Sequence, residues 1–442
     1  TVTGLTPATR YFYRFIAPDG SMSPVGRTKT LPLGAVARCG IAVFSCSNLG
    51  FGHFNAYRHA AARDDIDFAV HLGDYIYEYQ HGTYPAMAEV VAGRLPLPAH
   101  EIVALADYRL RYASYRADPD LQALHAAMPM IASPDDHEST NDSWEGGAQN
   151  HQADEGDWSI RKAASMQAWR EWMPVSDEPW KAYQIGTLAT LFRTETRLLG
   201  RTRPHEVAEL LGAGDPVAAL KAFRDGAWSD PAATMMGWEQ EAWIAAAMAG
   251  SVRAGTRWQL AGFGTIMGQT VTPKQAAQWV SPDAPARLKN YVQAGVTMAS
   301  LDLPMNLDNW GGYPAARARF LTAAQAAEAN LIVLSGDSHN AWAYDLAQDK
   351  RAAGVEFAGH AVSSPGFEGA IRIDPKQVAS ALVGANPELK WCDTSRRGYM
   401  ALTLTPDAVR NDWLFVDTVT ERRATASIGH SATVARGRNV MA

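Results

Sequence analysis

The sequence predicts an α/β fold whose strands are buried on both faces. Four short apolar runs have the length of strands, and they occupy residues 39–45, 67–72, 127–133 and 330–335. Continuous apolar runs of this length are typical of strands that are covered on both sides. Helical patterns lie between them, at residues 55–63 and 315–329. Strands that alternate with helices in this way indicate a mixed α/β core.

The first 30 residues predict a separate small element. Apolar and polar residues alternate in TRYFYRF (9–15) and Pro18–Gly20 provides a turn, so we expect the last two strands of a β-sandwich. Two strands are not stable alone, and they must pack on the main body or on further residues of the protein. We expect residues 1–32 to form the C-terminal part of an N-terminal module and residues 33–442 to form the main domain.

Further elements are expected along the main domain. Residues 187–198 and 256–263 predict two more strands, and residues 239–248 predict a helix that buries its Trp243 face. The helical run near residue 315 is expected to begin at Tyr313–Pro314, because proline is favoured in the first turn of a helix.

A polar, tryptophan-rich stretch at residues 138–181 is interrupted by Gly146–Gly147, which indicates an insertion near the binding edge of the sheet. We expect its tryptophans to belong to the core, and the alternative is that they line an apolar or sugar-binding mouth. They are Trp144, Trp158, Trp169, Trp172 and Trp180.

Composition excludes several classes of protein. With 40 basic and 46 acidic residues the net charge is −6, so the chain has no broad basic field for sequence-independent nucleic-acid binding. Apolar residues make up 47% of the chain, which excludes global disorder. No uninterrupted apolar run approaches the roughly 20 residues of a membrane span. Three cysteines, Cys39, Cys46 and Cys392, are too few for a disulfide framework, and at least one thiol is unpaired.

Four of the predicted strands end in residues that bind metals. The clusters are Ser45–Asn48, Gly73–Glu78, Asp135–Glu138 and Gly336–His339. Sites in open α/β sheets form at the carboxyl ends of strands, so the four clusters are expected to meet in one crevice. Their oxygen and nitrogen donors suit hard or borderline metals. Two metals about 3.5–4 Å apart, bridged by a carboxylate, would polarise a phosphate and activate water.

Each cluster also has a simpler explanation when it is taken singly. The alternatives are a turn or helix cap at Asp74, a buried thiol at Cys46, an N-cap pair at Asp135–Asp136 with His137 on the surface, and a loop in which His339 packs against Trp342. Four strand ends that carry the same class of residue are hard to reconcile with four unrelated explanations. The coincidence therefore favours a metal site.

The motifs resemble those of calcineurin-like metallophosphoesterases, and among them those of PhoD-type alkaline phosphatases. The similar stretches are FSCSN (44–48), HLGDYIYEY (71–79), PDDHESTND (134–142), GYPAARARF (312–320), SGDSHNAWAYDL (335–346), VSSPGFE (362–368) and RRGYMALTLTP (396–406). They span nearly all of residues 34–419. The start of the chain, GLTPATRYFYRF (4–15), resembles the end of a fibronectin type III-like module.

The resemblance implies a four-layer α/β/β/α core and a metal-dependent phosphoester hydrolase that is periplasmic or secreted. It implies that a metal-bound hydroxide cleaves small phosphomonoesters, phosphodiesters or both, with ferric iron and calcium, or other divalent metals, as cofactors. Carried over by position, the metal ligands are Cys46, the bridging Asp74, the phenolate of Tyr77, Asp136 in place of the usual asparagine, Asp337 and His339. His137 takes the place of the proton donor or phosphate contact.

The sequence departs from the family pattern in the expected pocket wall. Pro134 replaces the usual tryptophan before DDHE, residues 261–270 read AGFGTIMGQT, and DNWGGY (308–313) has glycine where the family has an acid. These changes leave the substrate open, and the alternative is a phosphodiesterase, phospholipase D-like or phosphotriester-cleaving enzyme on the same site. Asn141 is expected to be a helix cap, an extra ligand or a phosphate contact.

Two other classes of function are less favoured. A serine hydrolase at Ser363–Ser364 is a weak alternative, because SSPG is not a G-x-S-x-G nucleophile elbow. A surface-binding module built around the fibronectin-like start would not explain the ligand-type residues at four strand ends.

Overall fold

Two β-sheets pack face to face in the computed structural model, which describes residues 2–212, 215–283, 286–423 and 425–442. The six-stranded sheet has the order β17 (Ala426–Ala435), β16 (Ala408–Val416), β15 (Gly398–Leu404), β3 (Cys39–Phe44), β4 (Phe68–His71), β5 (Met130–Ala132). The seven-stranded sheet has the order β14 (Leu389–Asp393), β12 (Ala341–Gln348), β13 (Arg351–Ala358), β11 (Leu331–Ser335), β10 (Trp258–Phe263), β9 (Ala189–Arg193), β8 (Lys181–Ile185).

The space between the sheets is filled by apolar side chains from both. Because side chains alternate along a strand, Ile41 and Val43 of β3 face inward and meet Leu260, Leu334 and Phe357 of the opposite sheet. This core explains why the strands read as continuous apolar runs, since their other faces are also covered.

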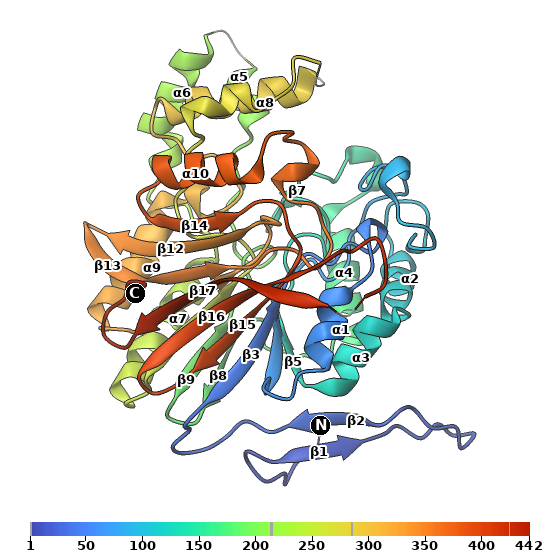
Figure 1. The fold of residues 1–442 in the computed structure, drawn as a ribbon. Coiled ribbons are helices and arrows are strands. Elements are labelled where there is room, and N and C mark those ends of the chain that lie inside the picture. Colours follow the sequence, from blue (N-terminus) through green and yellow to red (C-terminus); the bar gives the residue numbers. More distant parts are fainter. Residues whose placement is uncertain (1, 213–214, 284–285, 424) are drawn as a thin grey trace.

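Helices cover the outer face of each sheet (Figure 1). On the six-stranded sheet they are α1 (Asn55–Ala61), α2 (Leu105–Arg116), α3 (Pro119–Ala127) and α4 (Trp158–Trp172). On the seven-stranded sheet they are α7 (Trp238–Arg253), α9 (Pro314–Ala326) and α10 (Pro375–Ala385). The layers therefore run helix, sheet, sheet, helix, and the predicted mixed α/β class is confirmed.

The predicted elements of the main domain form close to their expected bounds. Strands β3, β4, β5, β9, β10 and β11 and helices α1, α7 and α9 all correspond to runs identified in the sequence. Helix α9 begins with Pro314 in its first turn after Tyr313, as expected. Trp243 is half-buried and packs against the helix-covered core of the seven-stranded sheet.

The strands after residue 335 have no counterpart among the predicted elements. Strands β12 to β17 complete both sheets, and they are mainly antiparallel. Register shifts between Leu346 and Ala347 and between Trp413 and Leu414 interrupt the two-residue alternation. Such irregularities in a strand weaken the pattern from which it is recognised.

The tryptophan-rich stretch is largely structural. Beside α4 it contains a small hairpin of β6 (Ser143–Trp144) and β7 (Gly147–Ala148). Trp169 is buried in the core under the six-stranded sheet, and Trp172 packs against that core. Trp180 lies near Trp243, with ring centroids 6.4 Å apart. The structure therefore agrees with the core interpretation for Trp169 and Trp172, whereas Trp144, Trp158 and Trp180 are half-buried and lie outside the core clusters of the described residues.

The N-terminal strands form an antiparallel hairpin of β1 (Arg10–Tyr13) and β2 (Gly26–Lys29) that lies below the main body in Figure 1. Arg27 attaches it to the body, because its Nε donates to Ala127 O at 2.6 Å. Lys29 forms an ion pair with Asp67. Phe12 is 70% exposed, so the hairpin leaves apolar surface uncovered.

A group of helices extends the other end of the molecule (Figure 1). It contains α5 (Val207–Leu211), α6 (Pro216–Asp225) and α8 (Ala286–Ala299). The 3₁₀ turns are η1 (Leu49–Phe51), η2 (Met87–Glu89), η3 (Ala153–Glu155), η4 (Ala227–Ser229), η5 (Lys274–Gln278), η6 (Trp310–Gly312) and η7 (Phe367–Gly369). Among the described residues, no helix has both the length and the apolar character needed to cross a membrane.

Candidate metal centre

The predicted ligand residues follow strands of both sheets. Cys46 comes after β3, Asp74 and Tyr77 after β4, Asp136 after β5, and Asp337 and His339 after β11. The loops touch directly, since Cys46 N donates to Gly73 O at 3.2 Å and Tyr75 N donates to Glu138 Oε1 at 2.6 Å. A Cβ atom at Gly336 would lie 2.7 Å from the Cβ of Ser45, so the β11 loop also lies against the β3 loop. The four strand ends therefore meet in one place, although they come from two sheets.

Four of these residues share an unusual backbone conformation. The φ angles are 60° at Cys46, 55° at Asp74, 63° at Asp337 and 59° at His339. Left-handed φ angles are uncommon for residues other than glycine and cost free energy, and they cluster at functional sites. The strained turns are thus a second indication, independent of side-chain type, that these strand ends form a site.

Gly73 lets two of these loops approach each other. It has a φ of 105°, and a Cβ atom there would lie 2.3 Å from the Cβ of Asp135. A side chain at this position would push Asp74 away from the Asp135–His137 loop.

The first group of donors combines sulfur, oxygen and nitrogen. Ligand atoms of Cys46, Asp74 and His339 lie within 4.8 Å of one another. The Tyr77 hydroxyl is 3.1 Å from Asp74 Oδ2 and 3.2 Å from His339 Nε2. Ser364 Oγ also lies 3.0 Å from the Tyr77 hydroxyl and so fixes its position. Four donors can therefore surround one ion.

A second group of donors consists mainly of carboxylates. It includes Asp74, Asp136 and His137, and an overlapping set is formed by Asp74, Asp135, Asp136 and Asp337. Asp74 belongs to every group. Its Oδ1 and the Oδ1 of Asp136 are buried without a hydrogen-bond partner. Because buried unpaired carboxylate oxygens are costly, these residues fit a pair of cations that shares Asp74.

Burial sets the ionisation of this cluster. Loss of solvent raises the pKa of Asp74 and of Asp337 well above the ordinary value, and neighbouring carboxylates add to the effect. A bound cation would oppose these shifts, since opposite charge favours the carboxylate form. Burial also lowers the pKa of His339 to about 3, so its imidazole is neutral, which is the form that binds metals.

His137 lies inside the site and not on the surface, so the N-cap alternative for this loop is wrong. Its side chain is 9% exposed and its Nδ1 is 2.7 Å from Glu78 Oε2. Burial lowers the pKa of His137, but the carboxylates of Asp136, Glu78 and Asp74 outweigh it and hold the pKa well above the ordinary value. The other ring nitrogen is left to face the site.

Glu78 is a residue whose role the sequence analysis missed. Besides His137, it accepts hydrogen bonds from Thr140 Oγ1 at 3.1 Å, Asn141 N at 2.8 Å and Asn150 Nδ2 at 3.0 Å. These contacts fix a buried carboxylate behind the imidazole. Asn141 itself donates from its side chain to Gln149 Oε1 at 3.0 Å.

Arg197 is the other missed residue, and it follows β9. Its side chain is fully buried, with Nε 2.7 Å from Asp135 Oδ1 and Nη2 3.0 Å from Asp135 Oδ2. Nη1 lies 2.6 Å from Asp308 Oδ2, and Nη2 lies 3.7 Å from Asp136 and 3.9 Å from Asp337. Both oxygens of Asp135 are thereby occupied, which leaves Asp74, Asp136 and Asp337 for a cation. A single arginine in TETRLLGR carries no motif signal.

Replacing Arg197 with methionine is expected to lower the free energy of unfolding by about 3–5 kcal/mol, the typical cost of breaking a buried ion pair from one side. Asp135 and Asp308 would be left buried without their partner. Urea unfolding of the metal-free protein measures the change. The control is Arg203→Met, because the Arg203–Glu209 pair is exposed and such pairs contribute little; equal losses in the two variants would contradict the role of Arg197.

The serines of SSPG do not form a nucleophilic site. Ser363 Oγ donates to Asn48 O at 2.7 Å, and Ser364 Oγ contacts Cys46 O and the Tyr77 hydroxyl. Their hydroxyls therefore support the metal centre. All three cysteines are buried and free, so Cys46 is available as a ligand.

Comparisons with known proteins agree with this geometry. Residues 41–413 match the family of PhoD-like phosphatases, and residues 1–32 match the N-terminal domain of PhoD-like phosphatases. The chain is 31% identical to alkaline phosphatase D of Bacillus subtilis (strain 168), over 96% of this chain and 67% of the relative.

Two solved structures are similar in fold. A structure of PhoD matches with a TM-score of 0.78 and 26% identity, over 99% of this chain and 78% of the other. Purple acid phosphatase PPD1 from seeds of yellow lupin (Lupinus luteus) matches with a TM-score of 0.56 and 13% identity, over 98% and 61%; this likeness concerns the fold alone. With the family match extending over most of the sequence, the chain belongs to the PhoD-like phosphatases and is a phosphoric ester hydrolase.

Proposed function

We propose that the protein is a metal-dependent phosphoester hydrolase that acts on phosphomonoesters, phosphodiesters or both. The observation that carries this proposal is the buried Asp74, which belongs to every donor group and has one carboxylate oxygen without a partner. Metal ions held there would polarise the phosphoryl oxygens and lower the pKa of a water molecule so that it becomes a nucleophile.

The donor types suggest a different ion for each half of the site. Cys46, Tyr77, His339 and Asp74 would hold ferric iron, because a phenolate and a thiolate supply anionic charge. Asp74, Asp136 and Asp337 would hold calcium, which prefers carboxylate oxygens; other divalent metals are the alternative.

The chain's own residues would prepare the substrate and the leaving group. His137 lies beside Asp74 and Asp136, and Glu78 holds its Nδ1. The free Nε2 would then donate a proton to the departing oxygen, or bind a phosphate oxygen. Arg197 positions the loop through Asp135 and does not need to touch the substrate.

We further propose the division of the chain at residue 32. The uncovered apolar side chains of the hairpin, such as Phe12, support its assignment as the end of a fibronectin type III-like module. The helix, sheet, sheet, helix layering supports a four-layer metallophosphoesterase domain for residues 33–442. A periplasmic or secreted location rests on the resemblance to exported relatives, and cell fractionation tests it.

An activity screen tests the proposed function. Purified protein loaded with iron and calcium is expected to hydrolyse a monoester, a diester or both, and a chelator is expected to abolish turnover. Metal content is measured on the same sample. Protein that has bound metal and hydrolyses neither substrate would contradict the proposal, and a preference for triesters would favour the alternative activity.

The identity of the iron ligand is tested by colour. A tyrosinate bound to ferric iron gives a charge-transfer band, so the iron-loaded protein is expected to be coloured and Tyr77→Phe is expected to lose the band. Tyr84→Phe is the matched control, because its hydroxyl lies 3.3 Å from His339 on the same wall. A band that persists in Tyr77→Phe would exclude Tyr77 as the phenolate ligand.

A further inference from the structure

A cavity of about 280 Å³ adjoins the candidate metal centre. Asp337 and Ser338 of the β11 loop form part of its wall. The rest comes from α5, the loop after β10, η5, α8, the segment 305–309 and the segments around β12 and η7. Among the described residues that line it, Asp337 is the one acidic side chain, and none is basic. The cavity therefore begins at a residue of the carboxylate group and extends away from it.

The wall of the cavity is apolar. It includes Ile266, Trp279, Met298 and Phe367, together with Val292 of α8. Of these, Ile266, Trp279 and Met298 are at most 6% exposed, so they are held firmly by the surrounding core. Rigid apolar walls favour apolar ligand groups, because their burial releases water without a loss of hydrogen bonds.

Several polar atoms of the wall already have partners. Tyr344 and Thr270 bond to each other at 2.8 Å, and Trp342 Nε1 donates to Ser338 Oγ at 2.8 Å. Asn309 Oδ1 accepts from Gly311 N at 2.8 Å. The Thr272 hydroxyl is buried without a partner, and among the described residues the side-chain amide nitrogens of Asn306 and Asn309 also have no hydrogen-bond partner. Apolar side chains still make up most of the wall, so it matches an apolar substituent better than a sugar.

We propose that this cavity is a subsite for an apolar substituent of the phosphoester, so that the preferred substrates carry a medium-length alkyl chain or an aryl group. The inference rests on the proposed phosphoester hydrolysis, since the phosphate must sit at the metal centre for the substituent to reach the cavity. A volume of about 280 Å³ is roughly nine times that of a water molecule in the liquid. It accommodates a chain of about eight carbons.

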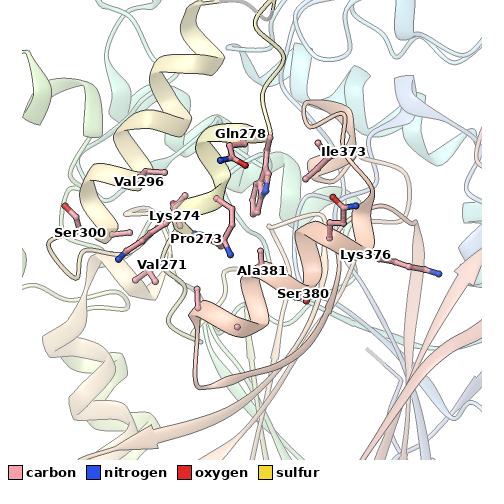
Figure 2. Close-up of a pocket in the computed structure, with 17 residues that line it drawn as sticks. Val271, Pro273, Lys274, Gln278, Val296, Ser300, Ile373, Lys376, Ser380 and Ala381 are labelled. Carbon is pink, nitrogen blue, oxygen red and sulfur yellow. The ribbon is translucent and has the colours of Figure 1, made fainter.

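A neighbouring cavity provides a control for substitutions that fill the proposed subsite. It measures about 1190 Å³ and lies between η5, α8 and α10 (Figure 2). Its lining includes Val296, one helical turn after Val292, but none of the candidate metal ligands. Both valines are half-buried on α8, so a large side chain at either position perturbs the helix similarly but fills a different cavity.

The test uses 4-nitrophenyl alkyl phosphodiesters with chains from methyl to dodecyl. In each, water adds its oxygen to phosphorus, the P–O bond to nitrophenolate breaks, and the alkyl group stays on the phosphate product. With metal-loaded protein, kcat/KM is expected to rise about two- to fourfold per methylene, within the limit set by burying one methylene, and to level off near eight carbons. A flat series would overturn the subsite.

Two variants locate the effect. Val292→Trp is expected to remove the gain with chain length, and Val296→Trp is expected to retain it; equal behaviour of the two variants would overturn the inference. Inhibition by octanol tests the subsite in the protein without any substitution, because octanol would compete with the alkyl chain for the cavity. It is expected to inhibit hydrolysis of the octyl ester and to leave the methyl ester unaffected, and equal inhibition of both would also overturn the inference.

Failure of the subsite and failure of the proposed function give different results. If the methyl ester is hydrolysed but kcat/KM does not change with chain length, the proposed hydrolase activity stands and the proposed subsite is excluded. Metal-loaded protein that hydrolyses no member of the series, and no monoester, would contradict the hydrolase itself.

Discussion

Replacing Asp74 with asparagine is expected to reduce both metal content and turnover by more than about 100-fold. Asp74 belongs to every donor group, so its change weakens both ions at once. The loss should exceed the 10–100-fold that is typical when only an outer partner of a ligand is removed. Asparagine is preferred to alanine for this test, because Asp74 has a φ of 55° and asparagine tolerates this conformation.

Asp349→Asn is the matched control for Asp74→Asn. Asp349 also has a positive φ, of 51°, but it is exposed in the turn between β12 and β13. Its variant is expected to retain metal and activity. The bridging role would be contradicted if Asp74→Asn bound as much metal as the parent. Asp337→Ala and His339→Ala are expected to weaken one metal more than the other.

Replacing His137 with alanine is expected to lower kcat by about 10²–10⁴, the usual contribution of a positioned acid or base, and to leave metal content intact. The loss should depend on the leaving group. A nitrophenyl ester needs little protonation and should suffer least, whereas an alkyl ester should suffer most. The test compares the loss of kcat for the two esters in His137→Ala, with metal content measured on the same sample.

A structural role for His137 predicts another pattern. Loss of a packing residue would lower stability and metal content together and would slow both esters alike, and that outcome would exclude a proton donor. Glu78→Gln refines the test, because glutamine can keep a hydrogen bond to Nδ1 but removes the charge behind the imidazole. It is expected to change the leaving-group dependence in the same direction as His137→Ala, by a smaller factor.

Much of the site's location could be predicted from the sequence. The apolar runs 39–45, 67–72 and 330–335 correspond to β3, β4 and β11, and donor residues follow each of them directly. Because parallel strands bring their carboxyl ends to one edge, order along the chain was enough to group Cys46 with Asp74. His339 follows a strand of the other sheet, and the packing of the two sheets brings it to them. The structure places these side chains together, and their roles as ligands remain predictions.

Other features required the three-dimensional structure. Local sequence does not specify the positive φ angles at Cys46 and Asp337, and Cys46 O accepts from Ser363 N and Ser364 N, which follow a strand of the other sheet. Arg197 lies 62 residues from Asp135, so its ion pair has no local pattern. The apolar cavity combines segments far apart in the chain, from Val207 to Ile371, and residue types alone do not reveal an empty volume.

The most direct test of the metal centre is the anomalous diffraction of crystals of the iron-loaded protein, measured on both sides of the iron absorption edge. We expect a peak within coordination distance of Cys46, Asp74, Tyr77 and His339, beside a second ion that shares Asp74. An iron peak elsewhere, or Tyr77 turned away from the ion, would contradict the proposed metal centre.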